Sequence, residues 1–247
     1  MREGLGVVLD LVFPRRCGGC RSPGWPFCAR CRERLGVLGP PGCVRCGRPF
    51  AWSVDTCADC PPPAIAWARS AFAYDEPVRR ALLNLKFGGA RSLGDAFVPQ
   101  MMRAAADRLE AEAVLAWVPL AKRRRRERGF DQAEVLARGL ATRTGLPIRS
   151  LLRRVRETDP QARRAAADRR RAPAGAFRVV DGPPANVVLV DDVLTTGATA
   201  AECARVLRHA GAERVGLVTA ARSLPGELPA RCYATVWRRP PSPAGEP

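Results

Sequence analysis

The stretch Val187–Thr199 constrains the fold of this 247-residue chain more than any other part of it. It consists of an apolar run, two adjacent acids, a short Thr/Gly loop and then an Ala-rich segment. A short apolar run of this kind is typical of a strand that is buried on both faces, as in a parallel sheet covered by helices. The Ala-rich segment predicts a helix, so the stretch predicts the strand, loop and helix of an α/β fold.

The loop between the predicted strand and helix is suited to bind a phosphate. Unpaired backbone N–H groups and the helix dipole both point at an anion placed there. Asp191 and Asp192 leave the strand just before the loop, where they could hold the hydroxyls of a sugar. A buried strand followed by an ordinary capped helix is the simpler alternative. The predicted phosphate-binding residues are Thr195, Thr196, Gly197, Ala198 and Thr199.

The rest of the chain beyond the cysteines alternates between predicted strands and helices, which indicates a parallel sheet flanked by helices. Ligands of such sheets bind at the carboxyl ends of the strands, where Asp191 and Asp192 lie. The predicted strands are Ala66–Tyr74, Val114–Val118, Val187–Val190, Arg214–Ala220 and Cys232–Val236, with a further strand-like segment at Ile148–Val155. The predicted helices are Glu76–Phe87, Ser92–Glu110, Phe130–Thr144 and Gly197–Ala210.

Eight of the ten cysteines form four C-x2-C pairs near the N-terminus. Each C-x2-C turn can direct two thiolates at one metal ion, and two turns complete a tetrahedral zinc site. About 65 residues with so little apolar alternation would bury little core unaided, so zinc would supply folding energy. We predict one or two structural zinc ions, bound by Cys17, Cys20, Cys28, Cys31, Cys43, Cys46, Cys57 and Cys60.

The spacing leaves open which cysteines share a metal. Neighbouring pairs would form two consecutive ribbons, whereas an interleaved cross-brace, or one site that has lost its metal, would use the same residues. Disulfides compete with zinc, but the paired spacing and the expected cytoplasmic setting favour zinc. The two remaining cysteines, Cys203 and Cys232, are expected to fill core space.

Composition indicates a globular protein, since 47% of the residues are hydrophobic. No stretch approaches the roughly 20 apolar residues of a membrane span. The run Gly4–Phe13 predicts a short amphipathic helix rather than a signal peptide, because no small-residue cleavage site follows it. We therefore expect a cytoplasmic protein without membrane contact. The stiff segment Pro61-Pro62-Pro63 separates the expected modules, a Cys-rich module at 1–63, an α/β domain at 64–239 and a disordered tail at 240–247.

The net charge of +17 is concentrated in two segments. Lys122–Arg128 contributes +5 and Arg149–Arg171 contributes +6. Concentrated positive charge is typical of proteins that bind an anionic ligand or polymer, although a solvated basic face is the alternative. Because the first segment follows a predicted strand, it would reach the ligand edge of the sheet, and Arg128 is the member that we single out.

The segment Arg153–Phe177 is polar, rich in arginine and short of apolar residues. Loops of this length in compact domains are commonly lids or disordered segments. Three polar residues of this loop would reach a ligand if it closed, or else remain solvated: Thr158, Gln161 and Arg169.

Together these motifs resemble those of the ComF family of phosphoribosyltransferase-like proteins, which is associated with DNA uptake in natural competence. Val190–Thr199 matches the family's signature for 5-phosphoribosyl diphosphate (PRPP), and the cysteine pairs resemble its double zinc ribbon. Further matches are Leu85-Lys86-Phe87 with Gly89, Pro119, Arg128-Gly129-Phe130-x-Gln132, and the loop residues Thr158, Gln161, Arg169 and Gly175-Ala176-Phe177. The chain departs from the pattern at Asp131 and Ala172, where Asn is usual, and at Arg164, where an apolar residue is common. The departures at Asp131 and Ala172 bear on recognition of the acceptor substrate.

The resemblance implies a phosphoribosyltransferase that uses PRPP and Mg²⁺ with an acceptor that it does not define. It implies that Asp191 and Asp192 hold the ribose hydroxyls and that Mg²⁺ bridges ribose and diphosphate oxygens. Lys86 and Arg128 would stabilise the charge that develops on the leaving diphosphate. Two other classes remain open. One is a single-stranded DNA handling protein that keeps the fold without the reaction, and the other is an adaptor whose ribbons dock a competence helicase.

Overall fold

The computed structural model describes residues 16–88, 90–155 and 175–224. Its centre is a four-stranded sheet in the order β1 (Trp67–Ala73), β6 (Arg214–Arg222), β5 (Asn186–Leu194) and β2 (Val114–Trp117). All neighbouring strands are parallel, so their carboxyl ends lie at one edge of the sheet. Val187–Val190 of β5 is fully buried, which agrees with a strand that is covered on both faces.

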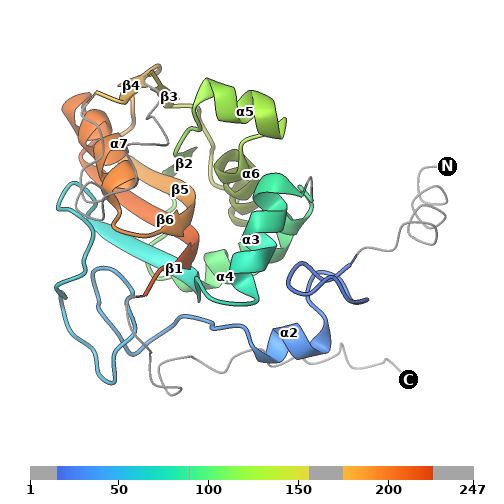
Figure 1. Ribbon diagram of the computed structural model, residues 1–247. Coiled ribbons are helices and arrows are strands. Elements are labelled where there is room, and N and C mark those ends of the chain that lie inside the picture. Colours follow the sequence, from blue (N-terminus) through green and yellow to red (C-terminus); the bar gives the residue numbers. More distant parts are fainter. Residues whose placement is uncertain (1–15, 89, 156–174, 225–247) are drawn as a thin grey trace, which may run out of the picture.

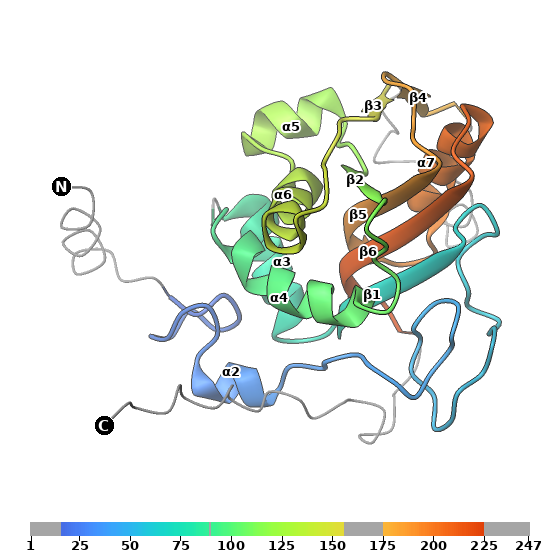
Figure 2. The same ribbon diagram turned by 180° about the vertical axis from the view of Figure 1, so that it is seen from behind.

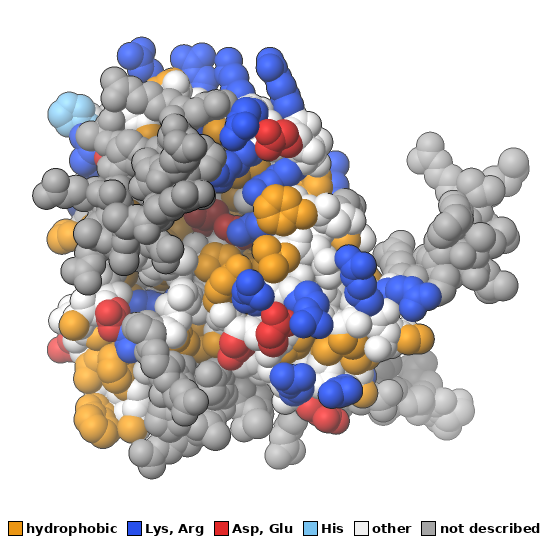
Figure 3. Space-filling view, viewed as in Figure 1, with side chains coloured by type: hydrophobic (Ala, Val, Ile, Leu, Met, Phe, Trp, Pro, Cys, Tyr) orange, Lys and Arg blue, Asp and Glu red, His pale blue; other side chains and the backbone are white. Residues whose placement is uncertain are grey.

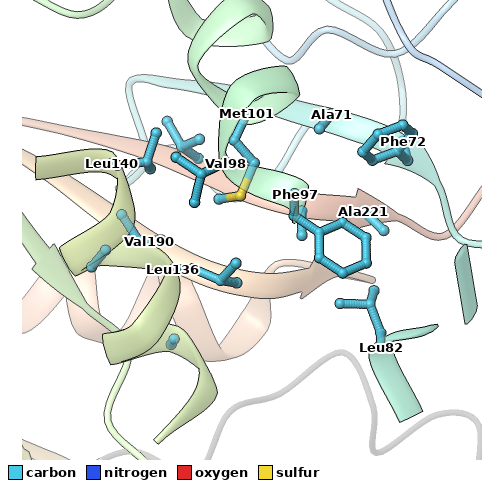
Figure 4. Packing of buried hydrophobic residues seen from close by; sticks show 14 of the residues in the cluster. Ala71, Phe72, Leu82, Phe97, Val98, Met101, Leu136, Leu140, Val190 and Ala221 are labelled. Atoms are coloured by element: carbon cyan, nitrogen blue, oxygen red, sulfur yellow. The ribbon is translucent and has the colours of Figure 1, made fainter. Parts of the chain in front are cut away.

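Helices cover the two faces of the sheet (Figures 1 and 2). On one face lie α3 (Val78–Phe87), α4 (Leu93–Ala105) and α6 (Gln132–Thr144), and on the other lies α7 (Ala198–His209). Figure 4 shows how Phe97 and Met101 of α4 fill the space between the sheet and α6, beside Leu136. The predicted α/β architecture of a type I phosphoribosyltransferase-like parallel sheet is confirmed.

A separate two-stranded sheet lies beside the main one. It pairs β3 (Leu152–Arg154) antiparallel with β4 (Phe177–Val179). The strand-like segment expected at Ile148–Val155 therefore contributes mainly to this hairpin, and only Ile148 makes an isolated bridge to β2. The N-terminal helix, the strand at Cys232–Val236 and the C-terminal tail that the sequence predicts lie outside the described residues.

Two short helices were not expected from periodicity. The basic run itself forms α5 (Lys122–Arg128), which Gly129 ends in the left-handed conformation with φ +76°. The other is α2 (Ala29–Glu33), which lies within the cysteine module. No residue of α5 is buried, so its charge rather than an apolar face distinguishes it.

The cysteine module packs directly on the α/β core. Its residues 36–38 run along the free edge of β1, where Leu38 N–H donates to Ala71 O (3.0 Å) and Ala73 N–H donates to Gly36 O (2.7 Å). Cys17 and Cys31 belong to the hydrophobic cluster under α3 and α4, and Cys43 and Cys46 belong to the cluster on the α7 side. The module thereby satisfies a sheet edge that would otherwise present unpaired backbone groups.

Candidate functional site

The acid pair ends the central strand at the carboxyl edge of the sheet. Residues of β5 alternate between the two hydrophobic clusters, with Val188 and Val190 in one and Val187 and Leu189 in the other. Because β5 continues to Leu194, this alternation directs Asp192 toward the α3 side and Asp191 toward the α7 side. The two carboxyl groups therefore approach one edge from opposite faces of the sheet.

Helix α3 brings Lys86 to the acid pair. Its last turn places the ammonium of Lys86 in an ion pair with the carboxylate of Asp192, whose residue is only 7% exposed. Lys86 and Asp192 are about a hundred positions apart in the sequence. The sequence predicts both of them as site residues, and the fold brings them together. Lys86 compensates the buried charge of Asp192, which would be costly to leave unpaired.

Asp191 lies in a less favourable electrostatic environment. Burial raises the pKa of its carboxyl group well above the usual range, and the neighbouring charge of Asp192 raises this pKa further. Lys86 partly opposes both effects. A carboxyl group that is held this way favours its neutral form until a cation or a set of donors approaches it.

The phosphate loop, Thr195–Thr199, connects β5 to α7. Gly197 is buried in the left-handed conformation (φ +74°) and is the N-cap residue of α7. Thr195, Thr196 and Thr199 are exposed, so hydroxyls gather at the start of the helix. The geometry therefore has the features expected of an anion-binding loop, namely a glycine turn, a helix N-terminus and accessible hydroxyl groups.

Arg128 completes the group of cations around the acids. Its guanidinium Cζ lies 4.6 Å from the ring centroid of Phe87, and its Nη1 donates to Oε1 of Gln132 (2.9 Å). Burial lowers the pKa of Arg128 and the nearby Arg124 lowers it further, whereas the charges of Asp192 and Asp131 oppose these effects. Arg128 is thus held in place by an aromatic ring and an amide, close enough to Asp192, the ion partner of Lys86, to interact with its charge.

In the sequence, Phe87 and Gln132 are recognisable only as members of the family motifs, and no role for either is apparent. Phe87 is 71% exposed although it is a large apolar residue. Its adjacency to Lys86 was the available signal, but its contact with Arg128 joins α3 to α5 and is not visible in sequence spacing. The two residues orient Arg128, which the sequence did single out.

Asp131, one of the departures from the family pattern, has a structural role. It is 2% exposed and caps α6, accepting bonds from the N–H groups of Ala133 (3.0 Å) and Glu134 (3.5 Å) through Oδ1. Its Oδ2 accepts from Leu120 N–H (2.9 Å), which fixes the turn after β2. Both carboxylate oxygens are therefore used within the protein. An Asn would present an amide N–H to the Leu120 donor in one of its two orientations.

The ends of the long polar loop are anchored near α7. Gly175 N–H donates to Oε1 of Glu202 in the early part of α7 (2.9 Å), and Val155 N–H donates to Ala176 O (2.8 Å). The expected ligand contacts Thr158, Gln161 and Arg169, together with Arg164 and Ala172, lie outside the described residues. Their role remains a prediction.

The charge distribution follows the elements just described. Figure 3 shows basic side chains along the upper rim of the face seen in Figure 1, where α5 lies, and acidic side chains recessed near its centre. A recessed acidic group with basic side chains beside it is suited to a ligand with both hydroxyl groups and phosphate groups.

The cysteines form two groups made from neighbouring pairs. Within each group all four Sγ atoms lie within 4.8 Å of one another, and all eight residues are free thiols. This excludes the cross-brace and disulfide alternatives for these residues, and the donor set and spacing fit tetrahedral Zn²⁺. The first ribbon site is Cys17, Cys20, Cys28 and Cys31, and the second ribbon site is Cys43, Cys46, Cys57 and Cys60.

The thiols of the second ribbon differ in how readily they ionise, because burial raises the pKa of Cys43 and Cys57, whereas the pKa of Cys46 is lowered. Burial opposes ionisation of Cys46, but the guanidinium of Arg222 and local hydrogen bonds outweigh it and lower the pKa of this thiol to about 7. Cys203, by contrast, is fully buried in the core on α7, as expected, and burial raises its pKa well above the usual range. Cys232 lies outside the described residues.

Comparison with known proteins agrees with a cysteine-rich module followed by an α/β domain. The sequence model of the double zinc ribbon domain matches residues 8–61, and that of the phosphoribosyl transferase domain matches residues 129–241. DNA utilization protein YhgH of Salmonella typhimurium is 33% identical over 236 residues, covering 87% of this chain and 100% of the relative. The chain belongs to the ComF family. Two further relatives carry competence names, and they are more distant in sequence.

Competence protein F of Haemophilus influenzae is 27% identical over 80% of this chain and 90% of its own length. Competence protein ComFC of Bacillus subtilis is 28% identical over 77% of this chain and 81% of its own. Among solved structures, orotate phosphoribosyltransferase from Aeropyrum pernix aligns with 63% of this chain and 81% of its own at 21% identity, but its TM-score of 0.35 supports no argument.

The ComF assignment confirms the double zinc ribbon and the phosphoribosyltransferase-type domain that the sequence indicated. No helix in the described part of the chain is long and apolar enough to cross a bilayer.

Proposed function

We propose that this ComF protein binds PRPP with Mg²⁺ at the end of β5 and acts as a phosphoribosyltransferase on an acceptor whose identity the chain does not reveal. The observation that supports the proposal most strongly is the convergence of four features at one sheet edge. These are the acid pair, the glycine-containing phosphate loop, Lys86 from α3 and Arg128 from α5.

The proposed roles follow from the chemistry of each group. The 5-phosphate would lie against the N–H groups and hydroxyls of Thr195–Thr199, and Asp191 and Asp192 would accept bonds from the ribose hydroxyls. Bound Mg²⁺ would neutralise diphosphate oxygens, and an oxygen-rich site that keeps several waters suits it. The acid pair offers such oxygens.

Lys86 has a second task in this proposal. Without ligand, its ammonium pairs with Asp192. When ribose hydroxyls bind Asp192, Lys86 becomes available to the anionic diphosphate, beside Arg128. Both cations would then stabilise the negative charge that grows on the leaving group while positive charge develops on the sugar.

Calorimetry with PRPP and Mg²⁺ tests the site. Replacing both acids (Asp191→Asn/Asp192→Asn) should weaken PRPP binding by about tenfold or more, since hydrogen bonds to a charged group contribute about 1.5–3 kcal/mol each. Asp95→Asn, on the exposed surface of α4, is the control and should bind like the wild type. Equal affinity of the double variant and the wild type would refute the site assignment.

A second candidate function is binding of a single-stranded nucleic acid through α5. Lys122 and Arg126 are exposed, and neither has an ion-pair partner among residues 16–88, 90–155 and 175–224. The names of the relatives, DNA utilization protein and competence protein, favour this candidate. A row of unneutralised cations on one helix can follow a phosphate backbone.

Salt dependence tests this second candidate. Affinity for a single-stranded oligonucleotide should fall steeply with salt, and Lys122→Ala/Arg126→Ala should reduce the logarithmic slope by about 1.4, or about 0.7 per phosphate contact. Fluorescence anisotropy at several salt concentrations measures the slope. A slope that is unchanged in the variant, or binding that does not depend on salt, would exclude α5 as the contact.

A further inference from the structure

The second ribbon ends directly behind the phosphate loop. Its last ligand, Cys60, is followed by Pro61 and Pro62, which pack against the backbone of Gly197. A Cβ atom added at Gly197 would lie 3.0 Å from Cβ of Pro61 and 3.5 Å from Cδ of Pro62. The buried turn of the phosphate loop therefore rests on the chain segment that leaves the second zinc site.

This proline segment is held by an arginine of the same zinc site. Arg45 lies between the ligands Cys43 and Cys46, and its Nη2 donates to the carbonyls of Pro61 (2.9 Å), Pro62 (3.3 Å) and Ile65 (2.9 Å). Proline has no N–H group, so Pro61 and Pro62 cannot be fixed by donors of their own. The guanidinium of Arg45 holds this segment instead, through hydrogen bonds to its carbonyl groups.

A second arginine attaches the other side of the ribbon to the sheet. Arg222, at the end of β6 and 2% exposed, donates to Cys46 O (2.8 Å) and Asp59 O (2.7 Å). The next residue, Ser223, donates its N–H to Leu194 O (2.9 Å), immediately before Thr195. The second ribbon is thus linked to the middle of the phosphate loop at Gly197 and, through Arg222 and Ser223, to the residue that precedes the loop.

The first ribbon makes different contacts. Its Gly18 carbonyl accepts from Nδ2 of Asn84 on α3 (2.8 Å), and its cysteines pack in the cluster under α3 and α4. In the parts of the chain that the structure describes, no contact of the first ribbon with the phosphate loop is recorded. The first zinc site therefore packs against α3 and α4, whereas the second lies against the phosphate loop.

We propose that Arg45 is a positioning residue for the phosphate loop, and that the second zinc site holds the proline segment which sets the conformation of Gly197. A contiguous set of contacts carries the coupling, from the Cys43–Cys46 knuckle through Arg45 and Pro61 to Gly197. The affinity part of this inference rests on the proposed function, whereas the conformational part does not. Zinc at the second ribbon thereby serves ligand binding as well as folding.

Arg45→Ala tests the inference, with Arg48→Ala as the matched control. Arg48 belongs to the same ribbon and loses the same charge, but it contacts Asp59 and the Phe50 ring and no carbonyl of the proline segment. Zinc content should stay at the wild-type value in both. In Arg45→Ala, amide hydrogen exchange over 194–200 should rise about tenfold or more without ligand, because the hydrogen bonds from a charged donor to three carbonyls are lost.

The same variant should bind PRPP with Mg²⁺ about tenfold more weakly, whereas Arg48→Ala should bind like the wild type. Unchanged exchange over 194–200 in Arg45→Ala, or an equal rise in Arg48→Ala, overturns the inference. If the wild type fails to bind PRPP, the proposed function fails, and the exchange measurement still decides the coupling. Should Arg45→Ala not fold, Arg45→Met, which keeps a long side chain but has no hydrogen-bond donor, replaces it with the same two criteria.

Discussion

At the scale of single residues, Asp191 and Asp192 are adjacent in sequence but differ in their surroundings. Asp192 has Lys86 as an ion partner, while Asp191 is half-buried on the opposite side and is repelled by its neighbour. An unpaired acid in such a place costs folding free energy whenever it is ionised. Sites that bind charged ligands often contain groups with displaced pKa values of this kind.

This cost gives a pH-dependent prediction for Asp191→Asn. Because the pKa of Asp191 is raised in the folded protein, the folded state binds more protons than the unfolded chain between the two pKa values, so stability falls as pH rises. Asp191→Asn has no carboxyl group at this position and therefore does not lose stability in this way as the pH rises. Its melting temperature without ligand should therefore increase relative to the wild type between about pH 5 and pH 8.

Thermal unfolding of both proteins across this range measures the effect, with Asp95→Asn as a control for an exposed acid. The difference in melting temperature between the wild type and Asp95→Asn should stay constant across this pH range. A constant difference for Asp191→Asn as well would show that the carboxyl group of Asp191 is solvated in the folded protein.

Gly197 gives a second prediction, and Gly145 provides the comparison. Both have φ +74°, but a Cβ at Gly145 meets nothing within 4 Å, whereas one at Gly197 meets Pro61. Each Gly→Ala change costs about 1–2 kcal/mol for the left-handed conformation. Gly197→Ala should cost a further 1 kcal/mol or so for the overpacked contact, and it should weaken phosphate binding. Urea unfolding measures the difference, and equal losses of stability would contradict it.

These residues also show what the sequence reveals at this scale. The acids and the loop were predictable because they form one local motif whose spacing fixes their relation. The ring of Phe87 beneath Arg128, and the bond from Leu120 N–H to Asp131, join different elements. No pattern along the chain encodes these two contacts, so the sequence did not reveal that Asp131 supports the turn after β2.

At the scale of elements, periodicity located β1, β5, β6 and the long helices but not the role of short segments. The basic run lacks apolar residues, so nothing in its pattern marked it as the helix α5. The strand at Leu152–Arg154 pairs with β4 across a long insertion, and that partner is not apparent from local sequence. Strand order was likewise open, since many orders are compatible with alternating strands and helices.

The segment 36–38 along β1 yields an element-scale prediction. Leu38→Pro removes both a buried side chain and the N–H that bonds to Ala71 O, whereas Leu38→Ala removes only the side chain. Leaving a buried carbonyl without its donor costs about 1–3 kcal/mol, so the Pro variant should be less stable than the Ala variant by that amount. It should also self-associate through the exposed edge of β1.

Urea unfolding gives the stability difference, and light scattering detects association. Equal unfolding midpoints for Leu38→Pro and Leu38→Ala would mean that the contact with β1 contributes no stability, and that the module does not protect the edge.

At the scale of the whole molecule, the zinc ribbons are part of one packed structure. The sequence suggested a boundary at the three prolines, and 1–63 and 64–239 remain a proposal for separate domains. However, the cysteine module contributes to both hydrophobic clusters and covers an edge of the sheet. Sequence composition cannot show such packing. A change in composition along the chain indicates a possible domain boundary, but not which residues of the two parts contact each other.

Zinc removal distinguishes the two descriptions of the molecule. If the ribbons belong to the core, a chelator should lower the temperature of a single cooperative transition. Structural zinc contributes several kcal/mol, and each kcal/mol shifts the melting temperature by about 2–4 °C in a chain of this size, so a shift above about 10 °C is expected. Calorimetry together with zinc release measures both quantities, and readdition of zinc should restore the transition. An early transition that accompanies zinc release, followed by an unchanged transition of the sheet, would instead establish 1–63 as a separable domain.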